Sequence, residues 1–193
     1  MNRLQLLALV LAVLFHTSPA SAIPAGTVAL QEWFLDVIPR VFPNATDNWQ
    51  APFEDGTLDQ NIVFKMNDAA ATTGLAAMRA YWAGTNALVT SRNEAYVMEI
   101  LGITAFGSDA AGKNGIVVAT GLSSVKTKEG NEYSDGLAST YAVVKWNEER
   151  QIRSIVEWRE VNTPPNYPYY PWGNTRNRAK SSIVLDDIAG SII

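Results

Sequence analysis

The sequence predicts an α+β domain, and three observations lead to that prediction. Helical periodicity is confined to the first half of the chain, where two amphipathic segments flank one strand-like segment. Four strand-like segments then follow one another between residues 95 and 161. The chain has 193 residues, enough for one domain with a real core, and helices followed by a run of strands predict helices that cover one face of a sheet.

The first 22 residues have the pattern of a cleavable signal peptide. Arg3 precedes an apolar run over residues 4–15 that only Gln5 interrupts, and residues 18–22 supply the small side chains of an A-x-A cleavage site. The run is shorter than the roughly 20 apolar residues that cross a bilayer, which argues against a transmembrane anchor. We therefore expect cleavage after Ala22, a secreted, extracellular protein, and one domain over residues 23–163.

The mature chain is acidic and lacks two reactive side chains. Removing Arg3 from the 15 basic residues leaves 14 against 19 acidic residues, a net charge of −5, so we expect no nucleic-acid partner. The chain has no Cys, and its single His, His16, lies in the signal peptide. These absences exclude Ser-His-Asp and Cys-His mechanisms and a zinc site of imidazole and thiolate. Any acid–base chemistry would therefore have to use Asp, Glu, Tyr or Lys.

An amphipathic helix is predicted over residues 27–42. Apolar side chains recur with helical spacing along one side, at Leu30, Trp33, Phe34, Val37, Ile38 and Val41. Pro39 lacks a backbone donor, so the helix should kink or end there. The loop that follows holds Asn44-Ala45-Thr46, the chain's one N-x-S/T sequon. Behind a signal peptide Asn44 is a candidate glycosylation site, with a chance triplet as the alternative.

A strand and a second helix come next. After the turn at residues 54–56, polar side chains alternate with the apolar Ile62, Phe64 and Met66, as in a half-buried strand. The second helix should begin near Thr73-Gly74 and present Leu75, Met78 and Trp82 on one face. We expect residues 84–86, Gly-Thr-Asn, to end or break it.

Four strands are predicted in succession after this helix. They cover residues 95–106, 115–125, 137–146 and 152–161, with turn-rich stretches at residues 107–114 and 126–136. Consecutive strands of this kind predict an antiparallel meander. The helices should then cover one face of the sheet.

The last thirty residues, 164–193, form a C-terminal tail of different composition. Residues 164–172 hold four prolines and four aromatic side chains, which favours extended polyproline-like structure over a helix or a central strand. We expect the aromatic side chains to pack across the domain or a partner subunit, with a disordered end as the alternative. The apolar end of the tail, residues 183–193, contains two aspartates and is too short for a membrane anchor.

The order of these elements resembles the nuclear-transport-factor-2-like (NTF2-like) superfamily, and within it the SnoaL-like polyketide cyclases. The resemblance covers roughly residues 28–164. It rests on the first helix and on the strands at residues 61–66 and 151–160. It also rests on residues 73–82, which are similar to a Gly-x-x-Ala-hydrophobic-Arg helix start. It implies a cone, in which a strongly curved antiparallel sheet wraps around the N-terminal helices and an apolar pocket opens at one end. Many members dimerise through the outer face of the sheet, so a homodimer is a candidate assembly.

The resemblance also implies where a general base should lie. In steroid-isomerase-like members the base is a carboxylate on the strand just before the Gly-initiated helix. Aligned without a gap, that position falls on Met66, and a shift of two residues would deliver Asp68. Scytalone-dehydratase-like members depend on histidines, which the mature chain lacks, so that mechanism is excluded.

The candidate catalytic residues are Asp59, Asp68, Tyr96 and Glu157. An apolar pocket can raise the pKa of a carboxyl group towards neutrality, and a tyrosine can donate a hydrogen bond to a developing enolate. Alternation along a strand puts Tyr96 and Glu99 on opposite faces, and likewise Glu157 and Trp158, so one residue of each pair can line a pocket. The alternative for each carboxylate is a solvated charge or an ion pair with a neighbouring arginine such as Arg92, Arg153 or Arg159.

Tryptophans are the candidate ligand-binding residues. Trp33, Trp82 and Trp158 would line an apolar pocket, with simple core packing as the alternative for each.

Together these patterns predict a protein that binds a small, largely apolar molecule, with no cofactor and no metal. Its reaction would be a cofactor-independent cyclisation, isomerisation or dehydration run by Asp, Glu and Tyr. The rival interpretation is a non-catalytic dimeric carrier or protein-interaction module, which the missing His and the Met66 at the base position favour. The two differ in whether a carboxylate and a tyrosine converge in one cavity.

Overall fold

A computed structural model describes residues 22–41, 48–67 and 69–163. Helices α2 (Ala25–Val41), α3 (Ala51–Glu54) and α4 (Leu75–Arg92) accompany one six-stranded sheet. Its strands are β1 (Leu58–Met66), β2 (Thr72–Thr73), β3 (Asn93–Gly107), β4 (Gly115–Thr127), β5 (Glu132–Asn147) and β6 (Ile152–Thr163). The α+β class predicted from the sequence is confirmed.

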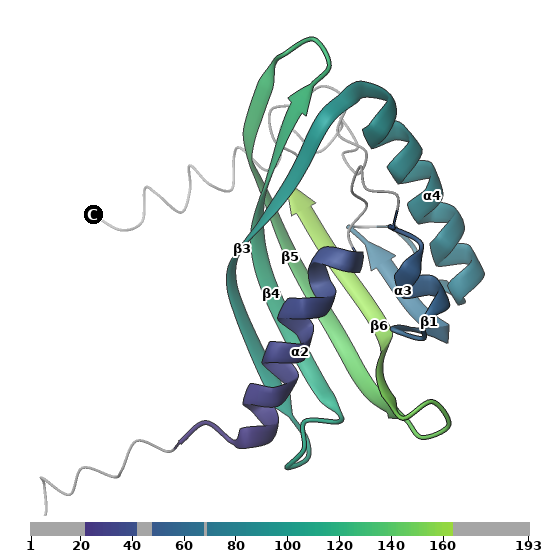
Figure 1. Cartoon of the computed structure of the whole chain (residues 1–193), viewed down its shortest axis with the longest axis vertical. Coiled ribbons are helices and arrows are strands. Elements are labelled where there is room, and N and C mark those ends of the chain that lie inside the picture. The colour runs from purple at the N-terminus through teal and green to yellow at the C-terminus, as the bar shows by residue number, and fades with distance from the viewer. Residues whose placement is uncertain (1–21, 42–47, 68, 164–193) are drawn as a thin grey trace, which may run out of the picture.

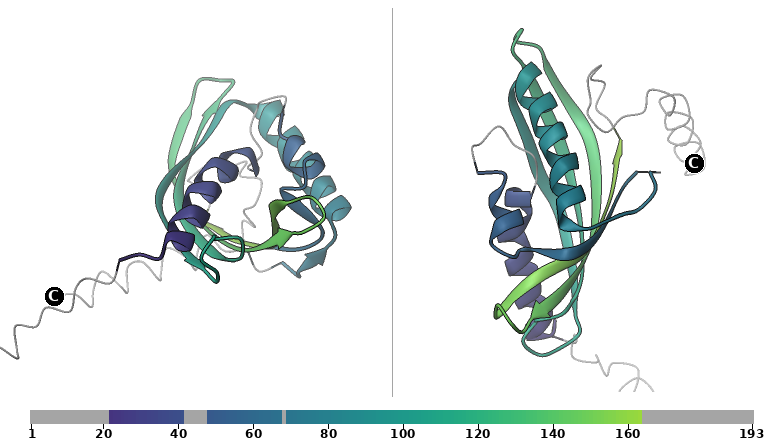
Figure 2. Two further views of the ribbon diagram at one scale, coloured as in Figure 1. Left: turned by 60° about the horizontal axis from the view of Figure 1, so that its bottom comes forward. Right: turned by 90° about the vertical axis from the view of Figure 1, so that its right-hand side faces the viewer.

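The sheet is curved, open and mixed. Its strand order is β2-β1-β6-β5-β4-β3, and β3 to β6 form the antiparallel meander expected from the sequence. Strand β1 instead pairs in parallel with β6, so the expectation of a purely antiparallel sheet is wrong in this one ladder. Register shifts interrupt the ladders β3–β4, β4–β5 and β5–β6, and such bulges increase the twist of long strands. The long strands curl around α2 and α4 (Figures 1 and 2).

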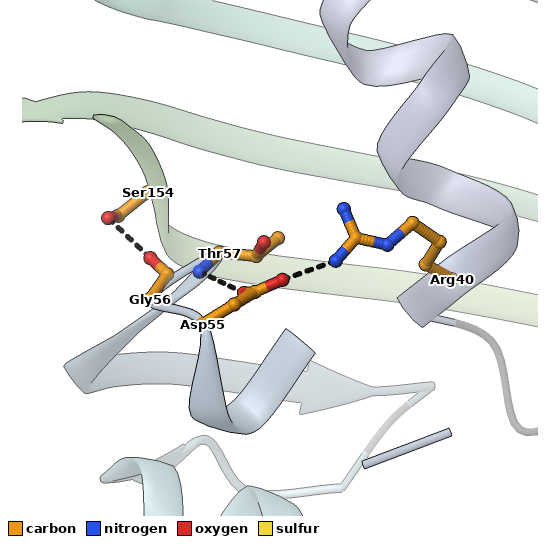
Figure 3. A network of polar contacts seen from close by, with 5 residues as sticks. All are labelled: Arg40, Asp55, Gly56, Thr57 and Ser154. Carbon is orange, nitrogen blue, oxygen red and sulfur yellow. Dashed lines mark hydrogen bonds and ion pairs between the residues drawn. The ribbon is translucent and has the colours of Figure 1, made fainter. Parts of the chain in front are cut away.

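The turn before β1 explains how this strand reaches the edge of β6. Asp55 pairs with Arg40 of α2 and accepts a hydrogen bond from the Thr57 backbone N–H at 2.8 Å (Figure 3). The Ser154 hydroxyl, at the start of β6, donates to the Gly56 carbonyl at 2.7 Å. The turn is therefore held on one side by a helix and on the other by the strand that β1 joins.

The two long helices differ from the sequence prediction at their ends. Helix α2 continues for two residues beyond Pro39, which lies in its last turn. The predicted break at residues 84–86 is wrong, because α4 runs on to Arg92. A glycine inside a helix costs only about 1 kcal/mol relative to alanine. Burial of Trp82, Thr85 and Val89 along one face of α4 offsets that cost.

The core lies between the helices and the concave face of the sheet. Phe34 of α2 stacks on Trp158 of β6, with ring centroids 6.2 Å apart, and Trp82 of α4 meets Phe64 of β1 edge-to-face. The Trp82 indole N–H donates to the Val41 carbonyl, which joins α4 to the end of α2. Among the described residues, no helix is long and apolar enough to cross a membrane.

The connection between β3 and β4, residues 108–114, is here called the Asp109 loop. The Asp109 carboxylate accepts four hydrogen bonds, from the backbone N–H groups of Ala111, Lys113 and Asn114 and from the Asn114 side chain, at 2.8–3.1 Å. These bonds, first among them the one from Lys113, lower the pKa of Asp109 to about 2. The loop is a fully satisfied polar structure.

The Asp109 loop also supports the N-terminal end of α2. The Gly107 backbone N–H donates to the Thr27 hydroxyl at 3.1 Å, and Gly26 lies against the loop so closely that a Cβ there would fall 2.0 Å from the Asp109 carbonyl oxygen. Gly112, at φ +62°, faces Gly26 with similar closeness. Glycine is required at this contact because two backbones meet with no space for a side chain.

Candidate functional site

Strand β6 presents a row of polar and aromatic side chains to the interior. Trp158, Glu160 and Asn162 alternate along the strand, and each is buried. Glu160 is the charged residue of this row, with 2% of its surface exposed. A carboxyl group buried to this degree requires an explanation, because such groups are normally paired or hydrogen-bonded.

The two carboxyl oxygens of Glu160 have different environments. The Trp158 indole N–H donates to Oε2 at 3.0 Å, whereas the buried Oε1 has no partner of good hydrogen-bond geometry among the described residues. Burial raises the pKa of Glu160 to about 7, against the smaller lowering effects of Trp158 and of the nearby Asn162 side chain. An indole N–H is a donor only, so Oε2 must accept, and the proton of the neutral acid belongs on Oε1.

Neighbouring strands contribute the surroundings of this carboxyl group. Thr140 of β5 is the ladder partner of Glu160 on one side, and Met66 of β1 is its ladder partner on the other. Both side chains are buried. The position at which an ungapped alignment would place a general base is therefore apolar, and a carboxyl group lies beside it on the adjacent strand.

Helix α4 brings a tyrosine close to the same carboxyl group. Burial, together with the negative charge of Glu160, raises the pKa of Tyr81 to about 12. Its phenol therefore remains a hydrogen-bond donor at neutral pH. The Tyr81 ring lies 5.7 Å from that of Phe64, between centroids, and about a third of the residue is exposed. Tyr81 therefore contacts both the core and the solvent.

A small cavity is lined by Thr140 but by none of Trp158, Glu160 and Asn162. It has a volume of about 10 Å³ and is lined by Ile38, by residues of β3 and β4, and by Ala138 and Thr140 of β5. This volume is close to the minimum that holds one water molecule. Thr140, which lines this cavity, is the ladder partner of Glu160.

The expected alternation along the strands is confirmed. Tyr96 is buried on the inner face of β3 and Glu99 is exposed, while Trp158 is buried and Glu157 faces outward, where it pairs with Arg159. Tyr96 belongs to β3, three strands away from the strand that carries Glu160.

The structure does not bring together Asp59, Tyr96 and Glu157, the three predicted catalytic residues that it describes. Asp59 accepts a hydrogen bond from the Asn61 backbone N–H at 2.7 Å and lines a polar surface depression of about 280 Å³ beside Arg150. Glu157 is held in its outward ion pair. Asp68 and the sequon residue Asn44 lie outside the described residues. Of the three described residues, Tyr96 is the one that the structure places in the core.

The three predicted tryptophans have different surroundings. Trp82 and Trp158 are fully buried, and Trp158 touches the carboxyl group of Glu160 directly. Trp33 is only partly buried, with the Arg153 guanidinium 5.8 Å from its ring centroid. Trp158 is therefore the tryptophan that belongs to the candidate site.

Sequence reasoning missed Glu160, although the signal was present. The alternation that puts Trp158 inside also puts Glu160 and Asn162 inside, two and four residues further along. Glu157 was predicted instead because its neighbours in the sequence are apolar, but its side chain faces outward from the same strand. Among the residues that the structure describes, no group of three His, Cys, Asp or Glu side chains could hold a metal ion.

Several solved structures share this architecture. An NTF2-like protein with a cystatin-like fold from Novosphingobium aromaticivorans aligns over 83% of this chain and 90% of its own, with a TM-score of 0.54 and 15% identity. Nuclear transport factor 2 from Cryptosporidium parvum aligns over 71% and 94%, with a TM-score of 0.50 and 14% identity. The hexachlorocyclohexane dehydrochlorinase LinA-type3 from Novosphingobium barchaimii aligns over 72% and 88%, with a TM-score of 0.52 and 8% identity.

These similarities establish the fold of the chain as NTF2-like. No protein-family model matches the sequence, and no curated protein matches it. At such low identities the solved structures carry no information about activity, which has to be argued from the site itself.

Proposed function

We propose that the chain binds a small, largely apolar molecule beside Glu160 and that Glu160 acts on it as a general acid and base. Binding requires the packed side chains around Glu160 to move apart, because the cavity beside Thr140 has a volume of about 10 Å³, enough for about one water molecule. The observation that supports this proposal is the Glu160 carboxyl group, which is buried and held by Trp158 through one oxygen, while the other oxygen has no partner of good hydrogen-bond geometry among the described residues. A buried carboxyl group with one poorly satisfied oxygen costs stability, and groups of this kind cluster at functional sites. The SnoaL-like pattern of the sequence is consistent with this use.

Glu160 can serve in both protonation states near neutral pH. Its pKa of about 7 makes both forms available, the condition under which a single group transfers protons efficiently. The neutral form donates from Oε1 to a carbonyl or ether oxygen, and the ionised form accepts a proton from carbon at the same atom. A proton taken from one carbon and returned to another is an isomerisation. In a dehydration, the acid protonates a hydroxyl group that leaves as water, and a proton is lost from the neighbouring carbon to the resulting carboxylate. Neither step uses a cofactor.

Tyr81 and Trp158 would support this chemistry in different ways. Trp158 is a positioning residue, because its indole N–H fixes Oε2 and leaves Oε1 to react. Tyr81 supplies a phenol that stays protonated and could donate to a developing oxyanion. We further propose that the mature protein acts outside the cell after removal of residues 1–22, which mass spectrometry of the secreted chain would test together with glycosylation at Asn44.

Native mass spectrometry of the secreted protein tests the binding part of the proposal. A retained small molecule at one copy per chain is expected, and an apolar molecule with at least one oxygen acceptor would support the assignment. Glu160→Gln is isosteric and should weaken retention, whereas Glu157→Gln, on the outer face, should not. An empty chain in every preparation would contradict the proposal.

A generic base probe tests the chemistry before any substrate is known. The probe 5-nitrobenzisoxazole loses its C3 proton to a base as its N–O bond breaks, and the resulting phenolate is coloured. Wild-type protein should accelerate this reaction, with a rate that rises with pH around a midpoint near 7. Glu160→Gln should lower the rate by about 100-fold, the usual size of a general-base contribution. An equal loss in Glu157→Gln would assign the activity elsewhere.

The rival function, a non-catalytic carrier or interaction module, is favoured by one observation. The outer face of the sheet exposes several large apolar side chains, among them Val97, Leu101 and Val161. A protein that retains a ligand but gives no Glu160-dependent rate with the probe would be a carrier.

A further inference from the structure

The outer face of the sheet is apolar and has no cover among the described residues. The large side chains Val97, Leu101, Phe106, Leu137 and Val161 are each 47–61% exposed on this face. Between them lie half-buried apolar residues of β4 and β5, namely Ile116, Val118, Leu122, Tyr141 and Val143. The helices all lie on the other side of the sheet (Figure 2). Thr120, Ser139 and the Glu157–Arg159 ion pair lie on the same face, so the exposed apolar side chains form patches between polar ones. Exposed apolar patches mark interaction sites in soluble proteins.

The polypeptide leaves the described domain at the edge of this apolar surface. Strand β6 ends at Thr163, two residues after the outward-facing Val161, and Thr163 is paired with Leu137 of β5. Thirty residues, 164–193, follow from that point. Two exposed apolar side chains of the outer face, Val161 and Leu137, therefore lie beside the start of the tail.

We propose that the segment at residues 164–172 of the same chain docks on the outer face of the sheet and covers its apolar side chains. The inference is independent of the function proposed for the interior. It assigns an occupant to the apolar face and a role to the aromatic residues Tyr167, Tyr169, Tyr170 and Trp172.

The length of the segment fits the surface. Three strand spacings separate β6 from β3, a distance of about 14 Å. Nine residues in polyproline conformation span about 28 Å, which is enough to cross the sheet obliquely. The chain must turn back over the end of β6 to begin the crossing, because Val161 and Leu101 lie behind Thr163 in the ladders.

The chemistry of the segment fits the surface as well. The face of a sheet offers side chains but no free backbone groups, since these are paired within the ladders. Residues 164–172 include four prolines, which have no N–H to donate, so a strand of this segment could form few ladder hydrogen bonds. Its aromatic rings can instead pack on the exposed Leu101, Leu137 and Val161 while its carbonyl groups remain in water.

Paramagnetic broadening in NMR spectra tests the docking directly. The chain has no Cys, so a single introduced Cys can carry a nitroxide label. Ser139→Cys places the label on the exposed outer face, beside Val161 in the ladder. Ala87→Cys places a control label on the exposed side of α4. In the full-length chain, the signals of residues 166–172 should lose most of their intensity with the label at position 139 and keep it with the label at position 87.

Mixing separates docking within one chain from docking between chains. A spin-labelled chain without isotopes is combined with an isotope-labelled chain without the spin label. Broadening that appears in the single sample and is absent from the mixture supports the proposal. Broadening that also appears in the mixture would assign the face to a second copy. No broadening, or broadening from position 87, would show that the segment lies elsewhere. Each of these last results overturns the proposal.

A charge on the apolar face provides a second test. Val161→Glu changes a side chain that is already 61% exposed, so the domain should fold, but the aromatic rings would meet a carboxylate. The variant should restore the signals of residues 166–172 in the presence of the label at position 139. Val28→Glu is the matched control, since Val28 is exposed on α2 and lies away from the outer face. Equal effects of the two variants would contradict the docking.

Discussion

Two acidic residues of this protein, Asp109 and Glu160, have opposite environments. Asp109 accepts four hydrogen bonds within its loop, and its pKa falls to about 2. Glu160 accepts one good hydrogen bond, from Trp158, and burial raises its pKa to about 7. The same functional group is thus fully satisfied at one place and poorly satisfied at the other. Asp109 therefore stabilises the fold, whereas Glu160 lowers its stability. A carboxyl group kept in such an unfavourable environment is a candidate acid–base residue.

The largest expected effect belongs to the satisfied region. Gly26→Ala would bring a Cβ within 2.0 Å of the Asp109 carbonyl oxygen, so α2 and the Asp109 loop must separate. We expect the free energy of unfolding to fall by about 3 kcal/mol, as in severe overpacking. Urea unfolding monitored by circular dichroism measures this loss.

Gly84→Ala is the control for this substitution. Gly84 lies in α4, and a Cβ at this position would have no neighbouring atom within 4 Å, so alanine there should raise the free energy of unfolding by about 0.5–1 kcal/mol. Similar changes in the two variants would show that α2 does not depend on its contact with the loop.

Glu160→Gln should have an effect of similar size but of opposite sign, and only at higher pH. The pKa is about 7 in the folded chain and 4.5 as the ordinary value, so between these pH values the folded state binds more protons than the unfolded state. Wild-type stability therefore falls as the pH rises from about 4.5 to about 7, by about 3 kcal/mol in total. Relative to wild type, the variant should gain that amount at pH 8 and little at pH 4.5. Urea titrations at both pH values measure the difference, and a gain that did not change with pH would contradict the assignment.

Asp109→Asn should have the smallest effect. An amide cannot accept all four hydrogen bonds, so the thermal midpoint at pH 7 should fall by less than that of Gly26→Ala. Because the folded pKa of about 2 lies below the ordinary 3.8, the unfolded state binds more protons between these values, and wild type loses this stabilisation as the pH falls. The gap between wild type and variant should therefore narrow towards pH 2. Ser108→Ala, in the same loop, should leave the midpoint at pH 7 unchanged.

The sequence predicted most of the fold because the signals were local. Helical spacing from Leu30 to Val41 and strand alternation after Glu94 depend on neighbours in the chain, and both are seen in the structure. The parallel pairing of β1 with β6 was not predictable in this way, because the two strands are about ninety residues apart and their pairing is fixed by the turn at Gly56 and by Ser154.

The candidate site was only partly predictable for the same reason. Alternation correctly placed Tyr96 and Trp158 inside and Glu99 and Glu157 outside. It could not show that Met66 of β1 and Glu160 of β6 would be ladder partners, since that contact depends on the parallel register. The carboxyl group expected on one strand lies on its neighbour.

The most direct test of the central claim is the pKa of Glu160 measured in the folded protein. Uniform labelling of glutamate with ¹³C at the side-chain carboxyl gives one signal per residue, and the signal missing from Glu160→Gln identifies position 160. We predict a titration midpoint near 7. A midpoint near the ordinary 4.5 would mean that the carboxyl group is solvated and ionised at neutral pH, and would contradict its role as a buried acid–base residue.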